Sequence, residues 1–284
     1  MCVLSILYDV VTCFRFLKNR LFKNTGEYAQ LFNKTGKAVM IEQCHWGQGP
    51  GFKGSSCDDY NFFRSSKDIE ASYQSILDNA HSVIQWQPWS AGAAGLVTGP
   101  GCWAYPDMLM VGNLDDFTTE RTHFGLWCIV SSPLVLSFDV ANETTLDRVW
   151  PIISNADAIA VNQAWAGHPG SLAGAWMLNG QPNPSKNPKK HATIELWAKP
   201  VAEHSVAVLI VNNGATVVPG GSQTLSFSPQ MVNFTGGGPN HTQIEVYDVW
   251  ANAVVGKIAI RGANVTVAKD LAKQDSAFYR LTAV

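Results

Sequence analysis

The hydrophobic and polar positions of this 284-residue chain follow different periods in its two halves. Up to about residue 163, short apolar runs alternate with segments whose apolar side chains recur at helical spacing. After about residue 166 the helical period disappears, and short β-rich runs separated by Gly, Pro and Asn follow. The first pattern is typical of a parallel sheet or a (β/α) barrel, and the second is typical of a β-sandwich.

The length of the chain allows two domains. We predict an α/β fold in which residues 1–165 form part of a (β/α)8 TIM barrel and residues 166–284 form an antiparallel β-sandwich. A complete barrel takes about 250 residues. The first domain is therefore expected to be the C-terminal portion of a barrel, and the chain to be part of a longer protein.

The period of the apolar positions also predicts individual elements. In the first half these are a helix ending at 27–32 and closed by Asn33 and Gly36, a strand at 38–43, a helix at 68–80, a strand and turn at 106–113, a helix starting at Thr118 or Thr119, a strand at 133–140, and a helix stopping near Pro151. In the second half, strands are expected at 193–200, 205–213, 224–230, 242–250, 257–262, 264–271 and 277–284.

Charge and composition exclude several classes of partner. The net charge is −2 with no long run of one sign, which argues against nucleic acid or a charged membrane surface as a partner. No apolar run is long enough to span a bilayer. The His and Cys residues show no CxxC or HExxH motif and no metal-ligand spacing, so we predict neither a metal nor another cofactor.

The cysteines and glycosylation motifs favour an oxidising compartment. Cys44 and Cys57 lie 13 positions apart in a Gly-rich loop and are a candidate disulfide. Together with the Asn-x-Thr motifs, they favour a secreted protein or one of the lysosome or vacuole, although Met1–Tyr8 does not have the pattern of a signal peptide. The Asn-x-Thr motifs begin at Asn33, Asn142, Asn233, Asn240 and Asn264.

Asp68 and Asp107 are the two candidate carboxylates for a catalytic or sugar-binding site. Asp68 follows Arg64 by four residues and an aromatic strand, so it is either the cap of the helix at 68–80 or a catalytic group at the end of a barrel strand. An arginine beside a carboxylate favours its charged form and can also bind a sugar hydroxyl. Asp107 follows Pro106 and is either a turn residue that accepts a hydrogen bond from its own backbone or a pocket residue.

His45 and Trp46 follow the strand at 38–43 and precede a long glycine-rich loop. A single histidine is more often structural than catalytic. An exposed tryptophan in such a loop provides a flat apolar face on which a sugar ring can stack, while most tryptophans simply fill a core. The two interpretations of Trp46 stay open on the sequence alone.

In this order, several motifs resemble glycoside hydrolase family 27, the α-galactosidases and α-N-acetylgalactosaminidases. They are LFNKTGKAVMIEQCHWG, FFRSSKDIEASYQSILD, GCWAYPDMLMVGN, TTERTHFGLWCIVSSPLVLSFDV and ISNADAIAVNQAWAG, with YDVWANAVVG and AFYRLTAV in the sandwich; together they cover residue 27 to the end. The resemblance implies a retaining hydrolase that acts on an oligosaccharide or glycoconjugate, as a monomer or homodimer. It leaves α-galactose, N-acetylgalactosamine and β-L-arabinopyranose as alternative sugars.

The resemblance also implies roles for individual residues. Asp68 matches the general acid/base, and Arg64 matches the arginine that contacts the sugar beside it. Asp107 and Met108 line the pocket, with Tyr105 standing where many members have an aspartate. His45 falls where many members carry a substrate-sensing residue, and Cys44 and Cys57 match a loop disulfide.

The second carboxylate is harder to assign from the sequence. A retaining glycosidase needs two carboxyl groups about 5–5.5 Å apart, one of which is the nucleophile. In the family this residue ends a strand in a KxDxC context, and here LYDVVTC offers only Asp9, with the wrong spacing to Cys13. The nucleophile is therefore either Asp9 or a residue on a barrel strand that this chain does not contain, and in the second case the chain is expected to be inactive as given. The alternative function is that of a non-catalytic carbohydrate-binding protein or a vestigial fragment.

Overall fold

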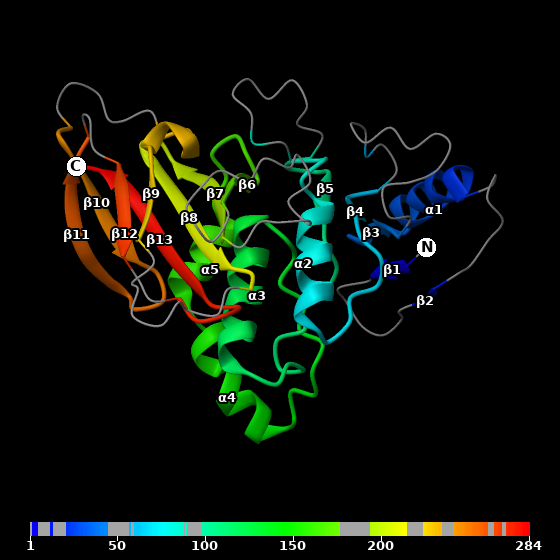
Figure 1. Cartoon of the computed structure of the whole chain (residues 1–284). Coiled ribbons are helices and arrows are strands. Elements are labelled where there is room, and N and C mark those ends of the chain that lie inside the picture. The colour runs from blue at the N-terminus through cyan, green and yellow to red at the C-terminus, as the bar shows by residue number, and fades with distance from the viewer. Residues whose placement is uncertain are drawn as a thin grey trace.

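The computed structural model describes residues 2–4, 12–13, 21–44, 57, 60–87, 89, 98–176, 194–214, 224–234, 241–260, 264–268 and 271–284. In Figure 1 the strands of the first half lie at the right, the helices of the middle segment lie in the centre, and the antiparallel strands of the second half lie at the left. The fold is therefore a partial α/β region with a parallel sheet, followed by a β-sandwich, as the sequence predicts.

The first sheet has the strand order β2-β1-β3-β4-β5. Strand β3 pairs with β4 and β4 with β5 in parallel, whereas β1 pairs antiparallel with both β2 and β3. Parallel strands joined through helices are the unit of a (β/α) barrel. The elements of this region are β1 (Cys2–Leu4), β2 (Thr12–Cys13), α1 (Leu21–Lys34), β3 (Met40–Gln43), β4 (Phe62–Arg64), α2 (Tyr73–Ser82) and β5 (Trp103–Tyr105).

Helix starts differ from the predicted ones. Helix α2 begins at Tyr73, not at Asp68, because the Ser72 side chain accepts the hydrogen bond from the Ser75 backbone N–H. Helix α3 (Phe117–Ile129) begins after Asp116, whose carboxylate accepts from the Thr119 N–H, so the predicted start at Thr118 or Thr119 is wrong. In each case a second capping side chain lies close by in sequence, and periodicity alone does not distinguish between the two.

The predicted strands at 106–113 and 133–140 are not formed. Strand β5 ends at Tyr105, because Pro106 has no N–H to donate and Asp107 has a φ of +94°. The two segments still meet, since the Leu109 N–H donates to the Val135 carbonyl at 2.9 Å. Two helices follow, α4 (Glu143–Ile153), which continues past Pro151, and α5 (Ala156–Gln163).

The second half forms antiparallel strands, as predicted, but it adds a strand at Ser171–Trp176 that was not predicted, and the strand expected at 257–262 begins at Ala253. A six-stranded sheet has the order β11-β10-β13-β8-β7-β6, and β9 pairs with β12 in a second, two-stranded sheet. All neighbouring pairs are antiparallel. The elements are β6 (Ser171–Trp176), β7 (Ile194–Ala202), β8 (Ser205–Asn212), β9 (Thr224–Phe227), η2 (Pro229–Val232), β10 (Gln243–Asp248), β11 (Ala253–Ala259), β12 (Val265–Ala268) and β13 (Ser276–Ala283).

The six-stranded sheet is covered on both faces. Every residue of β8 is buried, which explains why SVAVLIVN is a continuous rather than an alternating apolar run. One face packs in the sandwich core with Phe227 and Val265, and the other face packs against helix α3. Gly125 of α3 permits this close approach, because a Cβ there would lie 2.9 Å from a methyl carbon of Leu209. The sandwich and the α/β region therefore share one core.

Buried polar groups also join the two regions. His81 on α2 contacts Glu195 on β7 through Nε2 and Oε1 at 2.8 Å, and its ring stacks on Trp197. Lys199 on β7 donates through Nζ to the carbonyls of Val161 and Asn162 at 2.6 and 2.7 Å, at the end of helix α5. Burial lowers the pKa of Lys199 to about 7, while the two carbonyls favour its charged form.

Candidate functional site

Arg64, Asp68 and Asp107 come together at the carboxyl ends of the parallel strands. Arg64 is the last residue of β4, and Asp107 lies two residues after β5. The Arg64 guanidinium donates from Nη1 to Asp107 Oδ2 at 3.0 Å and from Nη2 to Asp68 Oδ1. One arginine thus holds two carboxylates at the edge of the sheet where barrel enzymes place their catalytic groups.

Asp68 is not a helix cap. Its side chain is 85% exposed, and α2 begins five residues later with its own cap, Ser72. The Asp68 carboxylate contacts Arg64, whose side chain is only 11% exposed. Of the two roles that the sequence left open, capping is therefore wrong. The other role, that of a catalytic group, stays a prediction. The structure shows an exposed carboxylate that the buried Arg64 holds at the edge of the sheet.

Asp107 is a turn residue, as one of its two interpretations predicted, and its role in a substrate pocket stays a prediction. Its Oδ1 accepts from the Met108 N–H at 2.8 Å, as in a turn, and its Oδ2 accepts from the Ile69 N–H at 3.0 Å as well as from Arg64. Burial raises the pKa of the Asp107 carboxyl, and the Arg64 charge and the two backbone N–H groups oppose that rise. Asp107 therefore links the loop after β4 to the loop after β5.

Helix α3 supports the loop that carries Asp107. The Trp127 indole Nε1 donates to the Asp107 carbonyl at 2.6 Å, and the Met110 N–H donates to His123 Nε2 at 2.8 Å. Burial lowers the pKa of His123 to about 3, so its imidazole is neutral and can accept this bond. Sequence reasoning missed both residues, because within TTERTHFGLWCIV they only continue a helical pattern.

Sequence reasoning also missed Glu42. Its carboxylate lies on β3, is 8% exposed, and accepts a hydrogen bond from the Tyr105 hydroxyl. Burial raises the pKa of Glu42 and also that of Tyr105. The Tyr105 hydroxyl therefore stays protonated and donates a hydrogen bond to the Glu42 carboxylate. The available signal was a single charged residue inside the apolar strand AVMIEQ.

The other predicted site residues are only partly placed. Met108 is 39% exposed beside Asp107, and its role in lining a pocket stays a prediction. His45, Trp46 and Asp9 lie outside the described residues, so their predicted roles stay predictions. Within the described part of the chain, no three His, Cys, Asp or Glu side chains gather as a metal site, and no helix could cross a membrane.

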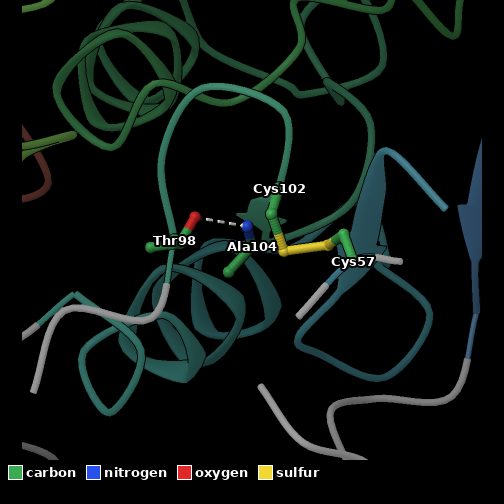
Figure 2. Close-up of a disulfide and its surroundings, with 4 residues drawn as sticks. All are labelled: Cys57, Thr98, Cys102 and Ala104. Carbon is green, nitrogen blue, oxygen red and sulfur yellow. Dashed lines mark hydrogen bonds between the residues drawn. A yellow bond between two sulfur atoms is a disulfide. The ribbon is translucent and has the colours of Figure 1, made fainter. Parts of the chain in front are cut away.

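The predicted disulfide between Cys44 and Cys57 is wrong. Cys57 instead pairs with Cys102, 45 residues further along the chain, with the Cα atoms 5.3 Å apart, and Cys44 is free. Figure 2 shows the bond beside the turn that leads into β5, where the Ala104 N–H donates to Thr98 Oγ1 at 2.7 Å. Cys44 is nearer to Cys57 in sequence, but the parallel pairing of β4 and β5 brings Cys102 within reach of Cys57.

Removing this disulfide should destabilise the α/β region. Cys57→Ser together with Cys102→Ser is expected to lower the free energy of unfolding by about 2–4 kcal/mol, because the bond closes a long loop in the unfolded chain. Urea unfolding of the oxidised protein measures this loss. Cys44→Ser is the matched control and should leave the midpoint unchanged. The pairing itself is contradicted if peptide mapping links Cys57 to Cys44.

Comparisons with known proteins agree on one family. A family model described as alpha galactosidase A matches residues 7–164, and a model described as the alpha galactosidase C-terminal beta sandwich domain matches residues 191–281. "Alpha-galactosidase 2" of Arabidopsis thaliana is 29% identical over 211 residues, which are 70% of this chain and 46% of that protein. This chain therefore spans less than half the length of that curated relative.

Solved structures show the same fold. The alpha-galactosidase of Saccharomyces cerevisiae superposes with a TM-score of 0.70 and 18% identity, covering 95% of this chain and 69% of that one, and it has also been solved with raffinose. A β-L-arabinopyranosidase of Geobacillus stearothermophilus gives a TM-score of 0.65 at 17% identity, over 92% of this chain and 54% of that one. At these identities the likeness shows the fold alone.

Proposed function

This chain belongs to the alpha-galactosidase family, glycoside hydrolase family 27, and on that premise we propose that it hydrolyses terminal α-D-galactosyl residues with retention of configuration. The observation that carries the proposal is the exposed Asp68 carboxylate, which Arg64 holds at the carboxyl edge of the parallel strands together with Asp107. The substrate class is an oligosaccharide or glycoconjugate with an α-galactosyl end, for which raffinose is the natural test compound.

In this mechanism Asp68 is the general acid and base. Its carboxyl proton passes to the glycosidic oxygen as the bond to the anomeric carbon breaks, and a second carboxylate attacks that carbon from the opposite face. Asp68, now ionised, then removes a proton from a water molecule, which displaces the enzyme carboxylate and releases the sugar. Exposure of the Asp68 carboxylate gives both the leaving group and the water access to it.

Arg64 and Asp107 position the sugar in this proposal. The Arg64 side chain is 11% exposed, and its Nη1 and Nη2 each donate to one carboxylate, Asp107 and Asp68. A guanidinium held in this way can donate to a sugar hydroxyl while it keeps Asp68 in place. Asp9 remains the proposed nucleophile, and an oxidising compartment, secretory or lysosomal, remains the proposed location.

The stereochemistry of the first product tests the proposal. The purified protein is incubated with raffinose and with an aryl α-galactoside, and the released sugar is followed by proton NMR before it mutarotates. Retention predicts that α-galactose appears first. Release of β-galactose first would overturn the retaining mechanism. Parallel assays with the N-acetylgalactosaminide and the β-L-arabinopyranoside identify the preferred ring.

The rival function is carbohydrate binding without turnover. It is tested in the same experiment, because the chain spans less than half of its curated relative and a partial site can bind without reacting. Binding of galactose by calorimetry, with no sugar released from either substrate, would replace hydrolysis by this function. Neither binding nor release would reject both.

A further inference from the structure

Glu42, Arg64 and Tyr105 lie on the same face of the parallel sheet. Glu42 pairs in register with Phe62 of β4, and Arg64 pairs with Tyr105 of β5. Side chains two residues apart on a strand point to the same face, so Phe62 and Arg64 share one face, and their partners share it with them. Phe63 points to the other face, where it is fully buried in a separate core.

The Tyr105 side chain crosses the middle strand to reach Glu42. The sheet order is β3-β4-β5, and the Tyr105 hydroxyl of β5 donates to the Glu42 carboxylate of β3. On the way its ring contacts that of Phe62, with the centroids 5.3 Å apart. Both members of the pair are buried, at 8% and 7% exposure. This contact, the Glu42–Tyr105 tether, joins β3 to β5 across β4, on the face of the sheet that also carries Arg64.

The tether is also part of the electrostatics of the site. The positive charge of Arg64 acts on Glu42 and on Asp107 and lowers the pKa of each carboxyl group, and the negative charge of Asp107 raises the pKa of Glu42. The Arg64 guanidinium therefore has Asp68 and Asp107 as hydrogen-bond partners and Glu42 as a third carboxyl group nearby.

We infer that Glu42, acting through the Tyr105 hydroxyl, is a positioning residue that fixes Arg64 and the Asp107 loop beneath Asp68. The inference rests on the proposed function, because it assigns Glu42 a role in the same site. Tyr105 is followed directly by Pro106 and Asp107, so holding its side chain holds the backbone that turns away from the sheet there. A misplacement of about 1 Å in such a group can reduce the rate about 10²-fold.

Three single variants test the inference. Glu42→Ala and Tyr105→Phe each remove the hydrogen bond, and each is expected to lower kcat/KM for an aryl α-galactoside by about 10- to 100-fold. Glu42→Gln keeps an acceptor oxygen for the tyrosine hydroxyl and should remain within about threefold of the wild-type value. A loss in Glu42→Gln as large as that in Glu42→Ala would overturn the inference, because the charge rather than the tether would then matter.

The double variant Glu42→Ala/Tyr105→Phe measures the coupling between the two residues. If they act as one tether, the double variant loses no more activity than the worse single variant. Independent, multiplying losses would contradict the inference. Glu203→Gln is the control for removing one negative charge, since that side chain is 89% exposed at the β7–β8 turn, and it should keep full activity.

Galactose binding separates failure of this inference from failure of the proposed function. In calorimetry, Glu42→Ala should weaken galactose binding about tenfold, and Glu42→Gln should not. These outcomes stand even if the chain binds without turnover.

If the wild type neither binds nor reacts, the proposed function fails, and the tether is judged by thermal unfolding. Equal melting of the double variant and the worse single variant then supports the tether, and a larger loss in the double variant overturns it.

Discussion

Asp68→Asn is expected to lower the turnover of α-galactosides by about 10²- to 10⁴-fold, the usual contribution of a general acid/base. The amide has nearly the same shape as the carboxyl group but can neither donate the required proton to the glycosidic oxygen nor remove one from water. Steady-state assays on raffinose and on an aryl galactoside measure the loss. An aryl galactoside with a good leaving group needs less acid assistance. The rate of the first step should therefore fall less for this substrate than for raffinose.

Folding stability should hardly change in this variant. Asp68 is 85% exposed and caps no helix, so the free energy of unfolding is expected to stay within about 0.5 kcal/mol of the wild-type value. Asp147→Asn, the same exchange at an exposed position of α4, is the matched control and should keep full turnover. If Asp68→Asn retains wild-type turnover, Asp68 is not the acid/base.

His81→Leu is expected to destabilise the chain by about 3–5 kcal/mol, because it leaves the Glu195 carboxylate buried without its partner. Glu195 lies on β7, is fully buried, and also accepts a hydrogen bond from the Trp197 indole at 3.0 Å. A buried charge that loses its partner costs more than the pair contributed. Urea unfolding followed by tryptophan fluorescence measures the change.

A second variant separates the buried charge from lost packing. In His81→Leu/Glu195→Gln, the glutamine oxygen still accepts from Trp197 but carries no charge, so about half or more of the lost stability should return. Were His81→Leu to unfold at the wild-type midpoint, the His81–Glu195 contact would contribute nothing to the stability of the packing between the two regions. Equal destabilisation in the single and double variants would assign the loss to packing instead.

Local patterns were sufficient to predict the architecture. The change from helical period to closely spaced β-runs near residue 166 separates the α/β region from the sandwich, because each period buries one face of its own element. The same patterns failed at element ends. Asp68 and Ser72 are both good caps, and only the packing of α2 selects Ser72. Residues 133–140 are apolar enough for a strand, but they make one backbone bond to Leu109 and no ladder.

The sequence by itself determined the two-part fold and indicated Arg64 and Asp68 as a candidate pair, while the loop in which they meet is held by tertiary hydrogen bonds such as that from the Ile69 N–H to Asp107. The tertiary structure decided what depends on strand register. Parallel pairing of β4 with β5 brings Cys102 to Cys57 and Asp107 to Arg64, and the order β3-β4-β5 lets Tyr105 reach Glu42. These three contacts join residues that are separated by 43, 45 and 63 positions in the sequence. They arise from the strand register, and no local period encodes them.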